Sequence, residues 1–156
     1  MTKRFFRATL TVCFLTLTLA PLSWAKTTKP VIAVFYFETQ GARSYVGPVV
    51  AKYLMSALAY LGKYKVVEPE KIDKVMEGSE IGEGDPVSTA DAVKLGKRLG
   101  AVIACRGKVA KSGEKYTVTV DFISTANGAV VTSKSANVTG EANLSKGIDR
   151  IVGLTD

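Results

Sequence analysis

The run Val31–Phe37 contains seven apolar, strand-forming residues and no charge. A run of this kind is typical of a strand that is buried on both faces, as at the centre of an α/β sheet. The polar stretch 38–44 follows, contains Gly41, and predicts a loop. Ser44 is the expected N-cap of the helix that comes after this loop.

A helix is predicted from Ser44 to about residue 61, because apolar residues recur there at spacings of four, four and three. This stripe consists of Val50, Leu54, Leu58 and Leu61. Pro48 falls in the first turn, where proline is tolerated, and Gly62 ends the helix. The next apolar stretch, Tyr64–Glu68, predicts a second strand that the intervening helix makes parallel to the first.

Two further helices are expected before the next strand. The first is short and opens at Pro69. An acidic loop over 77–87 follows, and its oxygen spacing does not fit a calcium-binding loop. Ser88 and Asp91 form a capping-box-like start for the second helix, which ends near residue 99.

The rest of the chain predicts an antiparallel meander and a last helix. The expected elements are strands over 101–110, 115–124 and 129–135 and an amphipathic helix over 141–153. The middle strand alternates, with Tyr116 and Val118 among its apolar positions, which indicates a half-buried antiparallel strand. Asn127-Gly128 is a strong signal for a two-residue hairpin, and the polar end of the strand after it indicates a sheet edge.

The predicted element order is therefore β-α-β-α-α-β-β-β-α. A parallel start followed by a meander gives a mixed α/β (α+β) sheet with the helices packed mainly on one face. Residues 31–156 are expected to form a single domain, and residues 26–30 a short polar lead-in.

Residues 1–25 are typical of a cleaved secretory signal peptide. Basic residues precede an apolar stretch over 8–20, and small residues stand at the −3 and −1 positions of a cleavage site after Ala25. This stretch is shorter than the roughly 20 residues of a membrane-spanning helix, so no transmembrane helix is expected after cleavage. Cys13 is not expected to be lipidated, because the preceding Val12 is not small. The predicted location is the periplasm, and association with the outer membrane is left open.

Charge and chemistry narrow the function. Cleavage removes three basic and no acidic residues, which lowers the formal net charge from +7 to +4 and argues against a nucleic-acid partner. The chain contains no histidine, which removes Ser-His-Asp and Cys-His catalysis and the usual zinc sites. Cys105 lies in an apolar run and is expected to be a buried hydrophobe. We predict no catalytic, cofactor-binding or metal-ligating residue, although carboxylate pairs such as Glu80 and Glu83 leave an acid–base enzyme open.

Several stretches, taken in order, resemble one family of envelope proteins. Val31–Glu38 resembles its opening strand, and Leu58–Glu68 and Ala92–Ala101 resemble its two helix-to-strand turns. The later hairpins at Gly107–Tyr116 and Asn127–Val131 also fit. The family comprises the periplasmic domains of the curli-assembly protein CsgG, the N-terminal domain of TolB and the flagellar protein FlgO.

The resemblance implies the mixed fold and a role that is mostly non-enzymatic. Family members serve in secretion channels, in flagellar rings, or as lipoprotein activators of peptidoglycan synthases. This chain lacks the usual lipidated cysteine and the long hairpin insertion with which the curli channel builds its pore. These departures favour an accessory domain over a self-contained pore.

Our leading hypothesis is a periplasmic accessory domain that binds an envelope or outer-membrane protein, or itself, during surface-structure assembly or envelope maintenance. One alternative is an outer-membrane-associated assembly or secretion subunit of the curli type. Another is a domain that binds a small ligand or peptidoglycan fragment, without a cofactor, at the C-terminal ends of the parallel strands. Two candidate interaction surfaces are the loop residues Glu38, Gln40 and Arg43 and the basic helix face formed by Lys94, Lys97 and Arg98.

Overall fold

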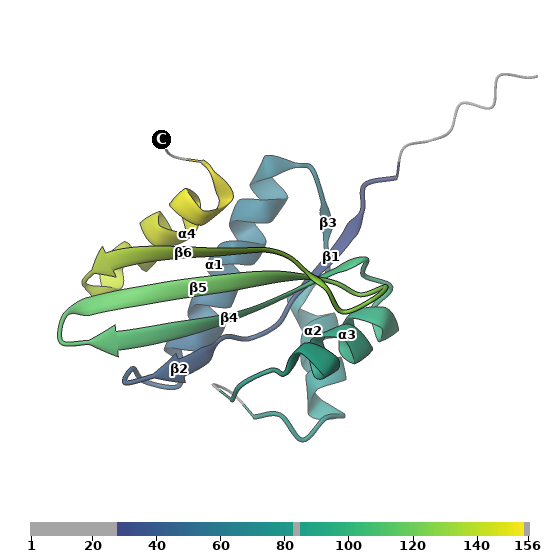
Figure 1. The fold of residues 1–156 in the computed structure, drawn as a ribbon, viewed down its shortest axis with the longest axis horizontal. Helices are drawn as coiled ribbons and strands as arrows, with labels where there is room; N and C mark the ends of the chain where they lie inside the picture. The colour runs from purple at the N-terminus through teal and green to yellow at the C-terminus, as the bar shows by residue number, and fades with distance from the viewer. Residues whose placement is uncertain (1–27, 83–84, 155–156) are drawn as a thin grey trace, which may run out of the picture.

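The computed structural model describes residues 28–82 and 85–154, so the predicted signal peptide and its cleavage site lie outside the described residues. The chain forms a mixed sheet with the strand order β3-β1-β4-β5-β6, and β2 also pairs with β4 (Figure 1). The strands are β1 (Val31–Val34), β2 (Glu38–Gln40), β3 (Lys65–Val66), β4 (Ile103–Ser112), β5 (Lys115–Ser124) and β6 (Val130–Thr139). The helices are α1 (Val46–Leu61), α2 (Pro69–Glu77), α3 (Thr89–Arg98), the 3-10 turn η1 (Glu141–Asn143) and α4 (Leu144–Val152).

The helices lie mainly on one face of the sheet. Helices α1 and α4 contact each other and cover the meander strands from one side (Figure 1). Helix α3 packs at the other side through Gly96, close to Ala104 of β4 and Thr125 after β5. The predicted mixed fold is confirmed, and the remainder of the face on α3's side carries short polar side chains that solvent reaches.

The first strand is shorter than predicted, and the stretch expected as a loop contains β2. Both strands pair in parallel with β4, where Val34 lies opposite Cys105 and Glu38 opposite Lys108. Three residues separate Val34 from Glu38, whereas two separate Cys105 from Lys108. The extra residue interrupts the parallel pairing with β4 at the point where the chain passes from β1 to β2. Burial on both faces is confirmed. The fully buried residues of the run are Ile32, Ala33, Val34, Phe35 and Phe37.

Two glycines make room for Phe37 where the chain passes from β1 to β2. A Cβ at Gly107 of β4 would lie 2.5 Å from the Phe37 ring, so a side chain there would displace the ring. A Cβ at Gly47, in the first turn of α1, would overlap the Phe37 carbonyl oxygen. The absence of these two side chains therefore lets the helix and the sheet close on the same aromatic residue.

The N-cap of helix α1 lies one residue later than predicted, because it is Tyr45 and not Ser44. Tyr45 occupies the N-cap position and makes no side-chain cap hydrogen bond. Instead, the backbone N–H of Val46 donates to the carbonyl oxygen of Arg43 at 3.0 Å, so a tight turn takes over part of the capping role. The predicted end is confirmed, because Gly62 adopts a left-handed conformation with a φ of 65°.

Helices α2 and α3 follow the prediction closely. Ile72 and Met76 are the buried residues of α2. Ser88 caps α3, since its Oγ accepts a hydrogen bond from the backbone N–H of Asp91 at 3.1 Å. The same hydroxyl donates to the Asp91 carboxylate at 2.6 Å, whereas in a capping box this carboxylate would accept from the Ser88 backbone N–H.

The two hairpins of the meander differ in how well they match. Strands β4 and β5 are joined through Gly113, as expected, whereas β5 and β6 are joined by the five residues 125–129 and not by a two-residue turn. A two-residue type I′ turn needs a positive φ at both positions, and among the described residues only glycines have one, so Asn127 does not supply it. The buried Thr125 hydroxyl donates to the carbonyl oxygen of Ala101 at 2.7 Å and anchors this longer loop.

Strands β4 and β6 both end later than predicted, at Ser112 and Thr139. Strand β4 begins at Ile103 and not at residue 101, and β6 continues to Thr139 because Ala136 and Val138 still point into the core. The predicted edge position of β6 is confirmed. The predicted last helix is divided into η1 and α4, and the residues that α4 buries include Leu144, Ile148 and Ile151.

Candidate functional site

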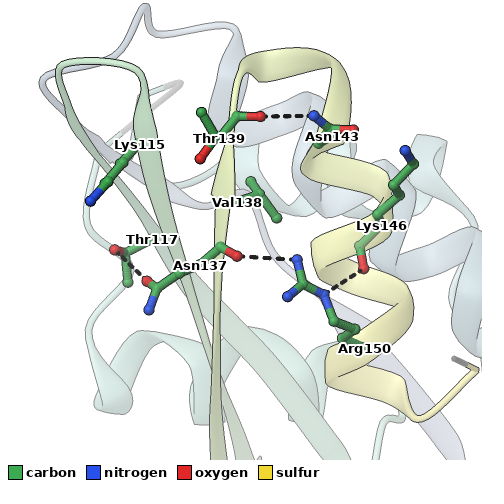
Figure 2. Close-up of a pocket in the computed structure, with 8 residues that line it drawn as sticks. All are labelled: Lys115, Thr117, Asn137, Val138, Thr139, Asn143, Lys146 and Arg150. Carbon is green, nitrogen blue, oxygen red and sulfur yellow. Dashed lines mark hydrogen bonds between the residues drawn. The ribbon is translucent and has the colours of Figure 1, made fainter. Parts of the chain in front are cut away.

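An open groove of about 550 Å³ lies where the edge strand β6 meets helix α4 (Figure 2). Its lining residues are Lys115, Thr117, Asn137, Val138, Thr139, Asn143, Lys146 and Arg150. Three of these eight residues are cations and none is a carboxylate. The groove therefore offers positive charge and hydrogen-bond donors to a ligand.

The turn η1 and helix α4 each bind the outer edge of β6 through one side chain that Figure 2 shows. The Arg150 guanidinium donates to the carbonyl oxygen of Asn137 at 3.1 Å, and the Asn143 amide donates to the carbonyl oxygen of Thr139 at 2.7 Å. An edge strand leaves such carbonyl groups without a neighbouring strand. The two contacts satisfy them and hold Arg150 at the groove wall.

The polar face of β5 and β6 extends from this groove as a ladder of short side chains. Thr117 donates to Asn137 at 2.8 Å, and the hydroxyls of Thr119 and Ser135 lie 2.9 Å apart. Further along, Ser133 donates to Asp121 at 2.6 Å. These cross-strand pairs fix the register of β6 on the face that no helix covers here.

The predicted loop residues lie on or near β2. The Gln40 amide donates to the Glu38 carboxylate at 2.6 Å, and the Arg43 guanidinium stands 6.0 Å from the centre of the Tyr45 ring. Glu38 lines a hollow of about 330 Å³ together with Arg106. The three residues are therefore engaged with neighbours and do not form one cleft wall.

The salt bridge in that hollow links the sheet to the loop before α3. Arg106 and Asp121 approach to 3.3 Å, with side chains 31% and 24% exposed. Arg106 also donates to the carbonyl oxygen of Val87 at 3.2 Å. This arrangement positions the chain next to the Ser88 cap and is structural in character.

The predicted basic face is exposed on α3, but it shares its surroundings with acids. Lys94 and Arg98 line a hollow of about 320 Å³ that Glu80 and Asp91 also line. The loop residues and the basic face therefore lie on separate hollows. Their role as interaction surfaces stays a prediction.

The cleft predicted at the C-terminal ends of the parallel strands is also divided. Tyr36, which follows β1, donates a hydrogen bond to Asp73 of α2. Both residues line a hollow of about 460 Å³ with Lys52 and Glu77. Glu38 faces the separate hollow beside Arg106, so Tyr36 and Glu38, which both follow β1, line different hollows.

Three titratable groups among the described residues have shifted pKa values. The hydrogen bond and charge of Lys71 lower the pKa of Glu68 below its ordinary value. The hydroxyl of Tyr45 donates to Glu141 at 2.8 Å, and this carboxylate raises the pKa of Tyr45 above its ordinary value. Burial raises the pKa of the Cys105 thiol well above its ordinary value, which keeps it protonated. The expectation of a buried cysteine is confirmed, and its thiol is unsuited to nucleophilic attack.

Within residues 28–82 and 85–154, no group of three or more Cys, Asp or Glu side chains is placed to hold a metal ion. The helices of this same part of the chain are all too short or too polar to span a membrane.

Sequence reasoning missed the groove beside β6. Lys146 and Arg150 stand four residues apart on the predicted last helix, which was a usable signal for a shared face. Lys115 is thirty-one residues before Lys146 in the chain, however, and joins them only because β6 pairs along β5. This long-range pairing is what the local pattern could not show.

No family model matches the chain, and no curated protein matches it. The fold is similar to that of the LpoB C-terminal domain from Escherichia coli, with a TM-score of 0.59 at 16% identity over 74% of this chain and 86% of that one. It is also similar to lipoprotein GNA1162 from Neisseria meningitidis, with a TM-score of 0.59 at 16% identity over 80% of this chain and 94% of that one.

A third similar structure is TolB from Acinetobacter baumannii, with a TM-score of 0.54 at 10% identity over 80% of this chain and 27% of that one. At these identities the similarity shows the fold. The predicted resemblance to TolB is confirmed at that level, and the resemblance to CsgG and FlgO stays a prediction.

Proposed function

We propose that the protein is a non-enzymatic accessory domain of the bacterial cell envelope that binds another envelope protein in the periplasm. The groove beside β6 carries this proposal. Lys115, Lys146 and Arg150 line it among hydroxyl and amide side chains, and its lining includes neither a carboxylate nor a thiol. Such a surface suits recognition of a polar, negatively charged partner better than it suits acid–base chemistry.

The fold and the N-terminal sequence support the same role. LpoB, a lipoprotein of Neisseria and TolB share this fold. The sequence resemblance independently implies envelope proteins that act by contact with other proteins. The predicted signal peptide would deliver the domain to the compartment where such partners are found.

Photocrosslinking in the cells that produce the protein tests the proposal. A photoreactive amino acid replaces Thr139, an exposed residue of the groove, and the envelope fraction is analysed for covalent adducts of defined mass. In this background, the double variant Lys115→Glu, Lys146→Glu reverses two charges of the groove. The matched control, Lys94→Glu with Lys97→Glu, makes the same charge change on α3.

We expect one dominant adduct that the groove variant loses and the α3 variant keeps. Loss in the α3 variant alone would transfer the interaction to the predicted basic face. The interaction role would be contradicted if the protein that carries only the photoreactive residue at position 139 formed no adduct and was monomeric in the soluble periplasmic fraction.

A further inference from the structure

We propose that the N-terminal half of β6, Val131–Ser135, pairs with an extended segment of a partner protein, which joins the sheet as an added strand. The segment carries an acidic residue with apolar residues two positions away on the same face. This inference rests on the proposed function, because it adds a second contact surface on the same edge strand and states what chemistry the partner presents there.

The backbone of β6 defines which of its groups are available. The N–H of Gly140 donates to the carbonyl oxygen of Glu114. The backbone N–H and C=O groups of the even-numbered residues of β5 therefore point towards β6. Alternation along the paired strands then turns the N–H and C=O groups of Ser133, Ser135 and Asn137 away from β5. The Arg150 contact to the carbonyl oxygen of Asn137 agrees with this assignment.

The two halves of this edge differ. Side chains of α4 and of the preceding turn η1 donate hydrogen bonds to the outward carbonyl oxygens of Asn137 and Thr139. In the part of the chain that the structure describes, no side-chain hydrogen bond reaches the outward backbone of Ser133 or Ser135. An unpaired stretch of this length is a template for one added strand, whose main-chain hydrogen bonds would provide affinity.

A shallow apolar groove of about 190 Å³ adjoins the open half of the edge. Its apolar walls include Leu61, Tyr64, Ile103, Phe122, Val131 and Val152. Val131 is 63% exposed, and the neighbouring Val130 is 50% exposed. Exposed β-branched residues beside unpaired strand backbone are unusual on a surface that stays in water, and a partner's apolar side chain would cover them.

Charge selects the partner. Lys63 and Lys134 line the apolar groove, and its lining contains no carboxylate. If a second copy of this chain paired antiparallel in the register that places Ser133 opposite Ser135, the two Lys134 side chains would lie opposite each other. Like charges directly opposite destabilise a strand pair, whereas an acidic residue at that position is favoured. An acidic segment of another protein is therefore the occupant.

The inference is tested by NMR with two capped seven-residue peptides. The acidic probe is Thr-Val-Thr-Glu-Thr-Val-Thr, and the control probe has Lys in place of Glu. Each is titrated into the purified exported protein labelled with ¹⁵N. The acidic probe is expected to shift the amide signals of Ser133 and Ser135 and of residues around the apolar groove, and to bind about two- to fivefold more tightly than the basic probe.

Two variants separate backbone pairing from charge. Ser133→Pro removes the outward N–H and should abolish the shifts, whereas Ser133→Ala keeps the N–H, loses the same hydroxyl contact to Asp121, and should retain them. Lys134→Glu should reverse the preference between the two probes. Well-dispersed β5 amide signals serve as the folding control for each variant.

Equal binding of both probes, shifts confined to another surface, unchanged binding after Ser133→Pro, or no shift with either probe would each overturn the inference. Concentration-dependent broadening at Ser133 without a probe would show self-pairing and would overturn it as well. These outcomes leave the crosslinking result for the groove beside α4 intact, so failure of strand addition is distinguishable from failure of the proposed function.

Discussion

The aromatic ring of Phe37 occupies the space that a side chain at Gly107 would fill. The two residues belong to different segments, one just before β2 and one in β4, and the missing Cβ leaves the ring fully buried. The contact lies where one extra residue interrupts the pairing of the first strand with β4. Gly107 therefore leaves room for the Phe37 ring beside this interruption of the pairing.

Replacing Gly107 tests this arrangement. Gly107→Ala should lower the free energy of unfolding by about 1–3 kcal/mol, because the added methyl group would lie 2.5 Å from the Phe37 ring. Urea denaturation measures the effect. Gly78→Ala is the matched control, since a Cβ there meets atoms only at 3.8 Å, and it should change stability by less than about 0.5 kcal/mol. Equal stability of the two variants would contradict the packing argument.

The capping assignments can be separated by two serine variants. Ser88→Ala should destabilise the protein by about 1 kcal/mol, because it removes the acceptor for the Asp91 N–H at the start of α3. Ser44→Ala should have little effect, since Tyr45 and not Ser44 stands at the N-cap of α1. Thermal unfolding of both variants gives the comparison. A larger loss for Ser44→Ala would restore the sequence-based assignment.

The pKa of Tyr45 provides a prediction for alkaline pH. Because Glu141 raises this pKa, the folded protein holds the phenol proton more tightly than the unfolded chain does. The stabilisation is therefore complete below about pH 10, the usual tyrosine value, and is lost as pH rises through the raised pKa. Glu141→Gln should lower the pKa of Tyr45 towards 10 in an NMR titration, and Glu114→Gln should not. An unchanged pKa after Glu141→Gln would exclude this carboxylate as the cause.

Cys105 should react with a thiol reagent only after the protein unfolds. Its side chain is fully buried, and the raised pKa keeps the thiolate population low. A colourimetric thiol assay with and without urea measures the difference. The unfolded mature protein should show one thiol per chain, whereas two thiols would mean that Cys13 is retained and would contradict cleavage after Ala25. Rapid reaction of the folded protein would contradict the burial.

The elements that the sequence predicted well depend on local physical chemistry. The left-handed stop at Gly62 and the reciprocal bonds of Ser88 and Asp91 involve residues close together in the chain, so their signals were sufficient. The prediction that Ser44 caps α1 was wrong although this signal is also local. A backbone turn, in which the Val46 N–H donates to the Arg43 carbonyl oxygen, competes with a side-chain cap. Propensity could not rank these two solutions.

The failures elsewhere come from long-range pairing. Strand β2 exists because β4 continues past Cys105 and pairs with a second parallel strand. The sequence of a three-residue stretch such as Glu38–Gln40 does not by itself indicate such a pairing. Asn127-Gly128 lies in a longer loop because the Thr125 hydroxyl is anchored to Ala101 across the sheet. The cationic groove was missed for the same reason, since Lys115 and Arg150 meet only after β6 has docked.

The contacts of Arg150 and Asn143 with β6 also bear on whether the chain aggregates while it is being synthesised. A polypeptide is made from its N-terminus, so β6 is complete before the helix that covers its edge has been made. During that interval, the carbonyl oxygens of Asn137 and Thr139 are open to any other nascent chain. The turn η1 and helix α4 thus protect this part of the edge, and we expect a chain that ends just after Gly140 to aggregate through β6 although it encodes every strand of the sheet.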